Sequence, residues 1–200
     1  MNAHSLAVTG RSTTRSDKRL RIETAALELF VERGFHGTTV PEIARRAGVG
    51  TGTLYLYHCS KDKLLNSLYQ QWNSACFARL AAAARDAHTP RETFSAYWHA
   101  FVRFTNEHPC AYWFWVQFES SPYLSDETRR MEVESKRPLE ALFEDGAARK
   151  VFKPLPIPVL HAAAKGLFTE LKRLESTRGL VLTPALWRAA EEMVWEAIRR

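Results

Sequence analysis

Residues 39–61 read TVPEIARRAGVGTGTLYLYHCSK, and this stretch decides the fold. Thr39 is followed by Pro41 and Glu42, and this spacing predicts a capping box with proline in the first helical turn. Gly48 ends the predicted helix after about two turns. The sequence therefore predicts a short helix with a defined start and a defined stop.

A second short helix begins near Gly50 or Thr51 and runs to His58. A turn that contains glycine can swing this helix steeply across the one before it, which is the geometry of a helix-turn-helix. Ala44 is small enough to allow close approach, and Val49 and Leu54 can fill the crevice between the two helices.

This second helix carries more large and polar side chains than its small subdomain can bury. Residues at the N-terminal end of such a helix reach base edges in the major groove, and the helix dipole there favours phosphate. The hydroxyls at this end belong to Thr51, Thr53, Tyr55 and Tyr57, with Lys61 just beyond to neutralise a phosphate. The structural alternative is a plain three-helix bundle with a tight corner.

In the rest of the chain, apolar residues recur with the period of an α-helix. From Asp17 apolar residues recur at the spacing of one helix face, and Gly34 is a left-handed C-cap. Later helices are expected from Ser60 towards Ala87, from Thr89 to before Pro109, over 111–118, from Ser125 to near Gly146, over 158–177 and over 183–198. About nine helices and no convincing strand predict an all-α fold with three parts: a flexible basic arm over 1–16, a three-helix domain over 17–60 and a helical domain over 61–200.

Composition favours an anionic partner and argues against catalysis. The 200 residues carry a net charge of +6, and residues 1–65 hold ten Lys/Arg against six Asp/Glu. No HExxH, GxSxG, Walker or Rossmann pattern is present, so we expect no catalytic residue, no metal site and no cofactor. Three cysteines without CxxC spacing, no secretory leader and no membrane-length apolar run predict a cytoplasmic protein without membrane contact.

Residues 22–65 resemble the DNA-binding domain of the TetR family of transcriptional regulators. The matching segments are AALELF (25–30), RGF (33–35), GTT (37–39), EIA (42–44), AGV (47–49), GTLY (52–55), Tyr57 and SKDKLL (60–65). The resemblance implies a regulator, most simply a repressor, that binds an inverted-repeat operator in double-stranded DNA as a homodimer and is released by a small-molecule effector.

The resemblance also implies roles for single residues. Thr39 is a phosphate contact; Thr51, Gly52 and Thr53 form the base-reading edge; Tyr55, Tyr57 and Lys61 clamp phosphates and sugars. The chain departs from the family pattern in three places. Gly50-Thr51 replaces a usual Ser-Lys, His58 stands where Phe is usual, and Pro41 stands where some members carry a cation.

Aromatic residues are concentrated between residues 94 and 118. Core packing is the simpler interpretation, but the run from Tyr112 to Trp115 cannot all face one core. The resemblance implies an effector pocket in the C-terminal domain, and ligand sites are typically apolar with a few polar groups. The candidates are Trp98, Phe101, Tyr112, Trp115 and Phe118, with Gln117 and Glu119 as polar members, for a small apolar or cationic effector.

The last two helices carry wide apolar faces, which would serve either an intramolecular core or a partner. The resemblance implies that two such helices from each subunit form the dimer interface. The interface candidates are Ala163, Leu167, Leu171, Ala190, Met193 and Ala197. One alternative function remains at this point: an all-helical small-molecule-binding protein whose helix-turn-helix has degenerated, because the cationic position at Thr51 is lost.

Overall fold

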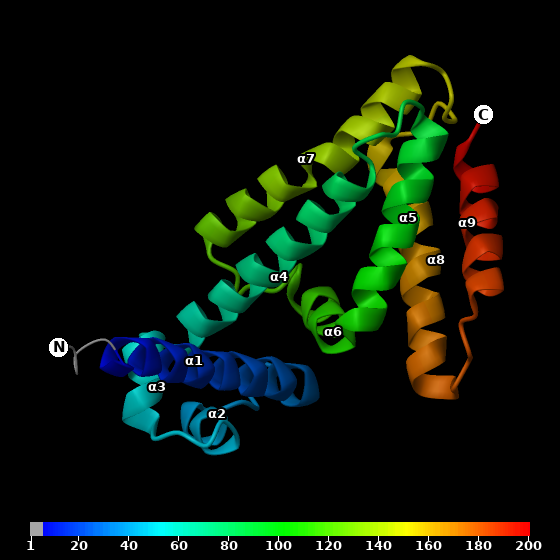
Figure 1. The fold of residues 1–200 in the computed structure, drawn as a ribbon. Helices are drawn as coiled ribbons and strands as arrows, with labels where there is room; N and C mark the ends of the chain where they lie inside the picture. Colours follow the sequence, from blue (N-terminus) through cyan, green and yellow to red (C-terminus); the bar gives the residue numbers. More distant parts are fainter. Residues whose placement is uncertain (1–5) are drawn as a thin grey trace. The chain divides into compact units, whose positions relative to one another are not determined.

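A computed structural model describes residues 6–200, with side chains from Arg15 onward. This part of the chain contains nine α-helices and no strand, as expected for an all-α protein (Figure 1). The helices are α1 (Leu6–Arg33), α2 (Val40–Arg46), α3 (Thr51–Tyr57), α4 (Lys61–Ala83), α5 (Pro90–Glu107), α6 (Pro109–Phe118), α7 (Asp126–Ala148), α8 (Ile157–Arg178) and α9 (Pro184–Ile198).

Helix α1 begins at Leu6, whereas the sequence predicted an arm as far as residue 16. The first five residues of that arm lie outside the described residues. No proline interrupts 6–16, and a distant side chain supports the added turns. The Tyr57 hydroxyl donates to the Arg15 carbonyl at 3.1 Å, and the Arg15 guanidinium lies 6.0 Å from the Tyr57 ring centre.

The predicted caps and turns are present. Thr39 closes a capping box with Glu42, and Ser60 accepts a hydrogen bond from the Lys63 amide at 3.1 Å. Gly34 and Gly48 have φ of 68° and 64°, a left-handed conformation that a side chain would strain. Local chemistry therefore determines where α1 ends and how α2 turns into α3.

The chain divides into two compact units, and the division does not follow the predicted boundary at residue 60. Unit 1 comprises residues 1–74 and 108–132, so it includes the first half of α4 and all of α6. The reason is aromatic packing. Phe114 and Phe118 of α6 lie 6.0 Å from the Phe30 ring of α1, and all three rings are buried.

Unit 2 comprises residues 75–107 and 133–200 and has a core of its own. Helix α9 packs against α5 and α8. The Trp98 indole of α5 donates to the Trp187 carbonyl of α9 at 3.1 Å, and Phe168 of α8 stacks on the Trp187 ring at 4.8 Å. A buried lysine, Lys172, forms an ion pair with Glu175 and also donates to the Asn106 side chain at 3.0 Å, so its charge is not left without a partner.

Candidate nucleic-acid interface

Helices α2 and α3 form the predicted helix-turn-helix against α1 (Figure 1). The Val49 amide donates to the Ala44 carbonyl at 2.9 Å and closes the turn between the two helices. Ala44 and Leu54 are buried at the crossing, and Val49 packs against the same core. The crevice is therefore filled as the sequence predicted, and the inner face of α3 packs into the core of unit 1.

The opposite face of α3 is open. Leu54 is fully buried, while Thr51, Gly52 and Tyr55 are exposed and Thr53 is half-buried. Successive helical residues turn by about 100°, so the buried Leu54 determines which side of this seven-residue helix points outward. The structure thus places five of the seven predicted DNA-binding residues on this one short helix, with Tyr57 half-buried at its end.

Thr39 lies at the N-cap of α2 and is exposed, but its hydroxyl has an internal partner. It donates to Glu42 Oε2 at 2.8 Å and accepts from the Glu42 amide at 3.4 Å. These bonds keep the pKa of the Glu42 carboxyl below its ordinary value. A phosphate contact by Thr39 stays a prediction, and the structural role of the residue is to start α2.

Lys61 differs most from its predicted role. Its ammonium donates to the Phe35 carbonyl at 2.7 Å and the Thr38 carbonyl at 2.8 Å, and lies 4.0 Å from the Phe35 ring centre. The side chain therefore ties the first turn of α4 to the segment between α1 and α2. The sequence identified the positive charge but not the carbonyls that hold it.

Replacing Lys61 by methionine should lower the free energy of unfolding by about 1–3 kcal/mol, because two charge-assisted hydrogen bonds are lost while the aliphatic stem remains. Lys63→Met is the matched control, since Lys63 is exposed and only two residues away. Urea denaturation followed by circular dichroism measures both. Equal midpoints for wild type and Lys61→Met would show that these bonds contribute nothing.

His58 stands at the C-cap of α3 and is buried, in place of the usual apolar residue. Its Nε2 lies 3.5 Å from Glu23 Oε1, and Arg19 donates to the same oxygen at 2.7 Å. Burial raises the pKa of Glu23, but His58 and Arg19 outweigh that effect and hold the pKa below its ordinary value. The Glu23 carboxylate on α1 thus lies beside the buried histidine. Because its pKa is lowered in the folded protein, the contribution of Glu23 to stability is lost as the pH falls and the carboxylate is protonated.

Two arginines beside the helix-turn-helix already have acidic partners. Arg46 makes a two-pronged contact with Glu32 at 2.7 and 2.9 Å, and Arg33 contacts Glu42 at 2.8 Å. Among the described residues, Arg45 on α2 and Lys63 on α4 are exposed cations for which no ion pair is found. Sequence reasoning did not single out Arg45, because nothing in the sequence distinguishes it from the adjacent Arg46, which the structure pairs with Glu32.

Comparison with known proteins identifies the family. Residues 22–68 match the family model "Bacterial regulatory proteins, tetR family", and residues 90–199 match "Tetracyclin repressor-like, C-terminal domain". The second match alone covers more than half of the chain. The chain belongs to the TetR family of transcriptional regulators. It is a transcription regulator of the helix-turn-helix type and not an enzyme.

Curated relatives agree with this assignment. The "Fatty acid metabolism regulator protein" of Bacillus subtilis is 35% identical over 75 residues, which are 38% of this chain and 39% of that protein. The "HTH-type transcriptional regulator BetI" of Rhizobium meliloti is 32% identical over 116 residues, 58% of this chain and 57% of that protein. The match thus spans two fifths to just over half of these relatives' lengths.

Solved structures share the fold along nearly the whole chain. A TetR family regulator from Marinobacter aquaeolei superimposes with a TM-score of 0.85 at 22% identity, covering 94% of this chain and 98% of that one. A putative TetR family regulator from Vibrio parahaemolyticus gives a TM-score of 0.72 at 26% identity, covering 92% and 99%.

The structure divides the predicted effector-binding residues of this TetR family member between its two units. Trp98 and Phe101 belong to unit 2, whereas the predicted residues 112–119 belong to unit 1. Trp98, Tyr112 and Phe118 are buried as core side chains. The predicted residues therefore do not form one cluster within either unit. The reason is that α6 follows α5 in sequence but packs on α1.

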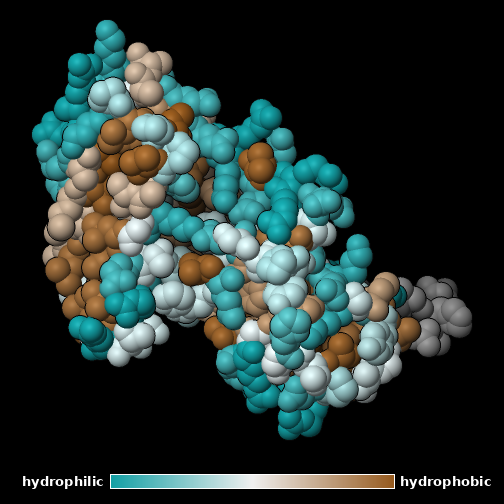
Figure 2. Space-filling view, turned by 180° about the vertical axis from the view of Figure 1, so that it is seen from behind, coloured by the Kyte–Doolittle hydropathy of each residue, from teal (hydrophilic) through white to brown (hydrophobic). Residues whose placement is uncertain are grey.

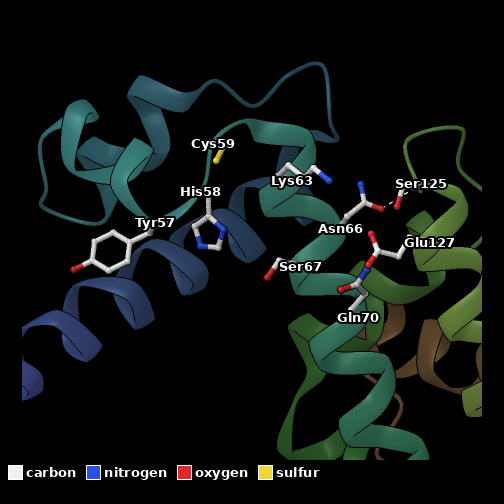
Figure 3. Close-up of a pocket in the computed structure, with 9 residues that line it drawn as sticks. All are labelled: Tyr57, His58, Cys59, Lys63, Asn66, Ser67, Gln70, Ser125 and Glu127. Carbon is white, nitrogen blue, oxygen red and sulfur yellow. Dashed lines mark hydrogen bonds between the residues drawn. The ribbon is translucent and has the colours of Figure 1, made fainter.

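A polar cavity of about 290 Å³ lies within unit 1, beside the C-terminal end of α3 (Figure 3). Its wall includes His58, Asn66 and Gln70, together with residues at the start of α7. Asn66 donates to the Tyr123 carbonyl and accepts from the Ser125 amide, and Gln70 donates to Thr128. The Asn66 and Gln70 side chains in the cavity wall thus use their hydrogen bonds to hold α4 against the start of α7. None of the predicted effector-binding residues lines this cavity.

The predicted dimer residues fall partly on an exposed apolar stripe of unit 2. Figure 2 shows hydrophobic side chains gathered on this part of the molecule. The stripe, here called the α8–α9 face, consists of Val159, Ala162, Ala163 and Gly166 on α8 with Leu186, Ala189, Met193 and Ala197 on α9. Of the remaining predicted residues, Leu167 and Leu171 are half-buried. Ala190 is buried on the inner side of α9, so it belongs to the core of unit 2.

No helix among residues 6–200 has the length and apolar character needed to cross a membrane.

Proposed function

We propose that the protein is a repressor that binds an inverted-repeat operator as a homodimer and leaves it when a small effector binds. The observation that carries DNA binding is the exposed face of α3 opposite the buried Leu54. An isologous dimer would present this face twice, so the operator should mirror the two-fold symmetry of the protein.

The proposed dimer rests on the α8–α9 face. Met193 is 63% exposed and Leu186 45% exposed. Gly166 has nothing within 4 Å of the position where a Cβ would stand. Small and apolar residues along two adjacent helices suit close helix packing against a second copy, which would cover side chains that one chain leaves in water.

The proposed effector site uses the aromatic cluster of unit 2. The half-buried Phe101 ring lies 4.5 Å from the Phe168 ring, and the Trp187 ring stacks on Phe168 at 4.8 Å. The Trp187 Nε1 is buried and makes no hydrogen bond to any described residue. An unpaired buried donor is costly, so a ligand that combines an apolar body with one acceptor oxygen would fit this cluster.

Release requires a ligand with different affinities for the two states of the dimer. A hundredfold preference for the DNA-free state corresponds to ~2.7 kcal/mol, and operator must then weaken ligand binding by the same factor. Candidate effectors should quench tryptophan fluorescence, with a higher Kd once operator is present. A ligand with equal affinity for free and DNA-bound protein would contradict induction without touching DNA binding.

Selection of duplexes from a random pool by the full-length protein tests the proposed operator. We expect an inverted repeat whose half-site centres lie about one helical turn apart, ~34–36 Å. A promoter carrying the selected site in front of a reporter should be repressed, and effector should relieve it. A relative from Mycolicibacterium smegmatis is named a transcriptional activator. Increased reporter expression in the presence of the protein would therefore show that this protein is an activator and not a repressor. Enrichment of a single unrepeated site would contradict the dimer.

A further inference from the structure

Leu56 is the most exposed large apolar side chain of the described residues, at 79%. It is the next-to-last residue of α3 and lies two positions after Leu54, which is fully buried, so the two side chains lie on opposite sides of the helix. Gly52 precedes it by four positions, so the two residues share one line along the helix. A Cβ at Gly52 would meet nothing within 4 Å. The outermost line of α3 therefore consists of bare backbone at Gly52 followed by the isobutyl side chain of Leu56.

This line offers no side-chain hydrogen bond to a base. The hydroxyl groups of α3 stand to either side of it, on Thr51 and Tyr55 along one flank and on Thr53 and Tyr57 along the other. In the major groove, guanine, cytosine and adenine present donors and acceptors, whereas thymine adds a C5-methyl group that an apolar side chain contacts. A leucine in this place matches thymine and leaves the polar edges of the other bases unsatisfied.

A protein partner fits these surroundings less well. On α2 and α3, Leu56 and Tyr55 are the large apolar side chains described as exposed, and the exposed cation Arg45 lies on the adjoining helix. Protein-binding patches have larger contiguous apolar cores. A small apolar group among hydroxyls and a cation suits the methyl groups and phosphates of a DNA groove.

We propose that Leu56 selects a thymine in each half-site by contact with its C5-methyl group, and that Gly52 lets the backbone of α3 come close enough for that contact. This inference rests on the proposed operator binding. In place of the cation that is usual at position 51, α3 would then use Leu56 to recognise the thymine methyl group.

A thymine-by-thymine replacement by deoxyuridine in the selected operator tests the proposal, because deoxyuridine lacks only the methyl group. One thymine per half-site should matter, by about fourfold, the ratio that corresponds to ~0.8 kcal/mol for one buried methyl-sized group. Replacing both should raise the Kd of the wild-type dimer about fifteenfold. Leu56→Ala should bind thymine and deoxyuridine operators within about twofold of each other.

Leu20→Ala is the control, since Leu20 is a leucine of the same unit that is 61% exposed on α1. It should keep the full discrimination, and both variants should keep the thermal midpoint of the wild type. A wild type that binds every deoxyuridine operator as tightly as the thymine operator would overturn the proposal while leaving operator binding intact. Discrimination that persists in Leu56→Ala would also overturn it. Failure to enrich any duplex would instead remove the proposed function on which this inference rests.

Discussion

Replacing Ala163 and Met193 by glutamate should dissociate the proposed dimer and leave a monomer at micromolar concentration. Both residues are exposed on the α8–α9 face, on neighbouring helices. In an isologous interface each substitution appears twice, so four carboxylates would enter an apolar contact without partners. Stripping water from such charges costs several kcal/mol each, which opposes association.

Light scattering coupled to size-exclusion chromatography measures the mass directly. Val133→Glu is the control, because Val133 is 56% exposed in the same unit but lies on α7, outside this face. The control should remain dimeric, and only the double variant should lose affinity for the inverted repeat. A monomeric wild type, or a double variant with the mass of the wild type, would show that the α8–α9 face is not the interface.

Replacing Trp98 by alanine should destabilise the protein by about 3–5 kcal/mol, the usual cost of emptying a large aromatic site. The Trp98 ring is buried, lies 5.4 Å from Phe168 and 6.0 Å from Trp187, and donates its indole hydrogen to the Trp187 carbonyl. From sequence alone, Trp98 was a candidate for effector contact, with core packing as the simpler interpretation. The structure makes it part of the core of unit 2, so loss of effector response in Trp98→Ala would report unfolding.

Thermal denaturation followed by circular dichroism separates these interpretations. A loss of that size lowers the midpoint by roughly 6–20 °C in a chain of this length. Trp98→Phe retains most of the ring but loses the hydrogen bond, and should fall between the alanine variant and the wild type. A Trp98→Ala protein that melts with the wild type would instead place the ring at a ligand-accessible position.

Features determined by neighbouring residues were predictable from the sequence. The capping box at Thr39, the left-handed glycines at 34 and 48, and the crevice filled by Leu54 all depend on residues within a few positions of one another. The residues of the α3 face follow from the same periodicity. For these features the interacting groups are close together along the chain, so the local sequence is enough to predict them.

Features determined by contacts between distant residues were not predictable. The carbonyls that accept from Lys61 belong to residues 23 and 26 positions earlier. Every residue has a backbone carbonyl, so the sequence does not indicate which of them lies near the lysine. Tyr57 supports α1 through a contact 42 positions away. The aromatic residues of 94–118 look like one cluster along the chain, yet the fold sends α5 and α6 into different units.

Binding of a fluorescently labelled random-sequence duplex at low salt, measured by anisotropy, tests the central claim most directly. A helix-turn-helix that works on DNA should bind any duplex through phosphate contacts, and log Kd should rise linearly with log salt, with a slope of about 0.9 per phosphate neutralised. We predict saturable binding with such a slope, weakened over all sequences by Arg45→Ala. Absence of binding at ~50 mM salt, where electrostatic contacts are strong, would contradict DNA binding and favour a ligand-binding protein with a degenerate motif.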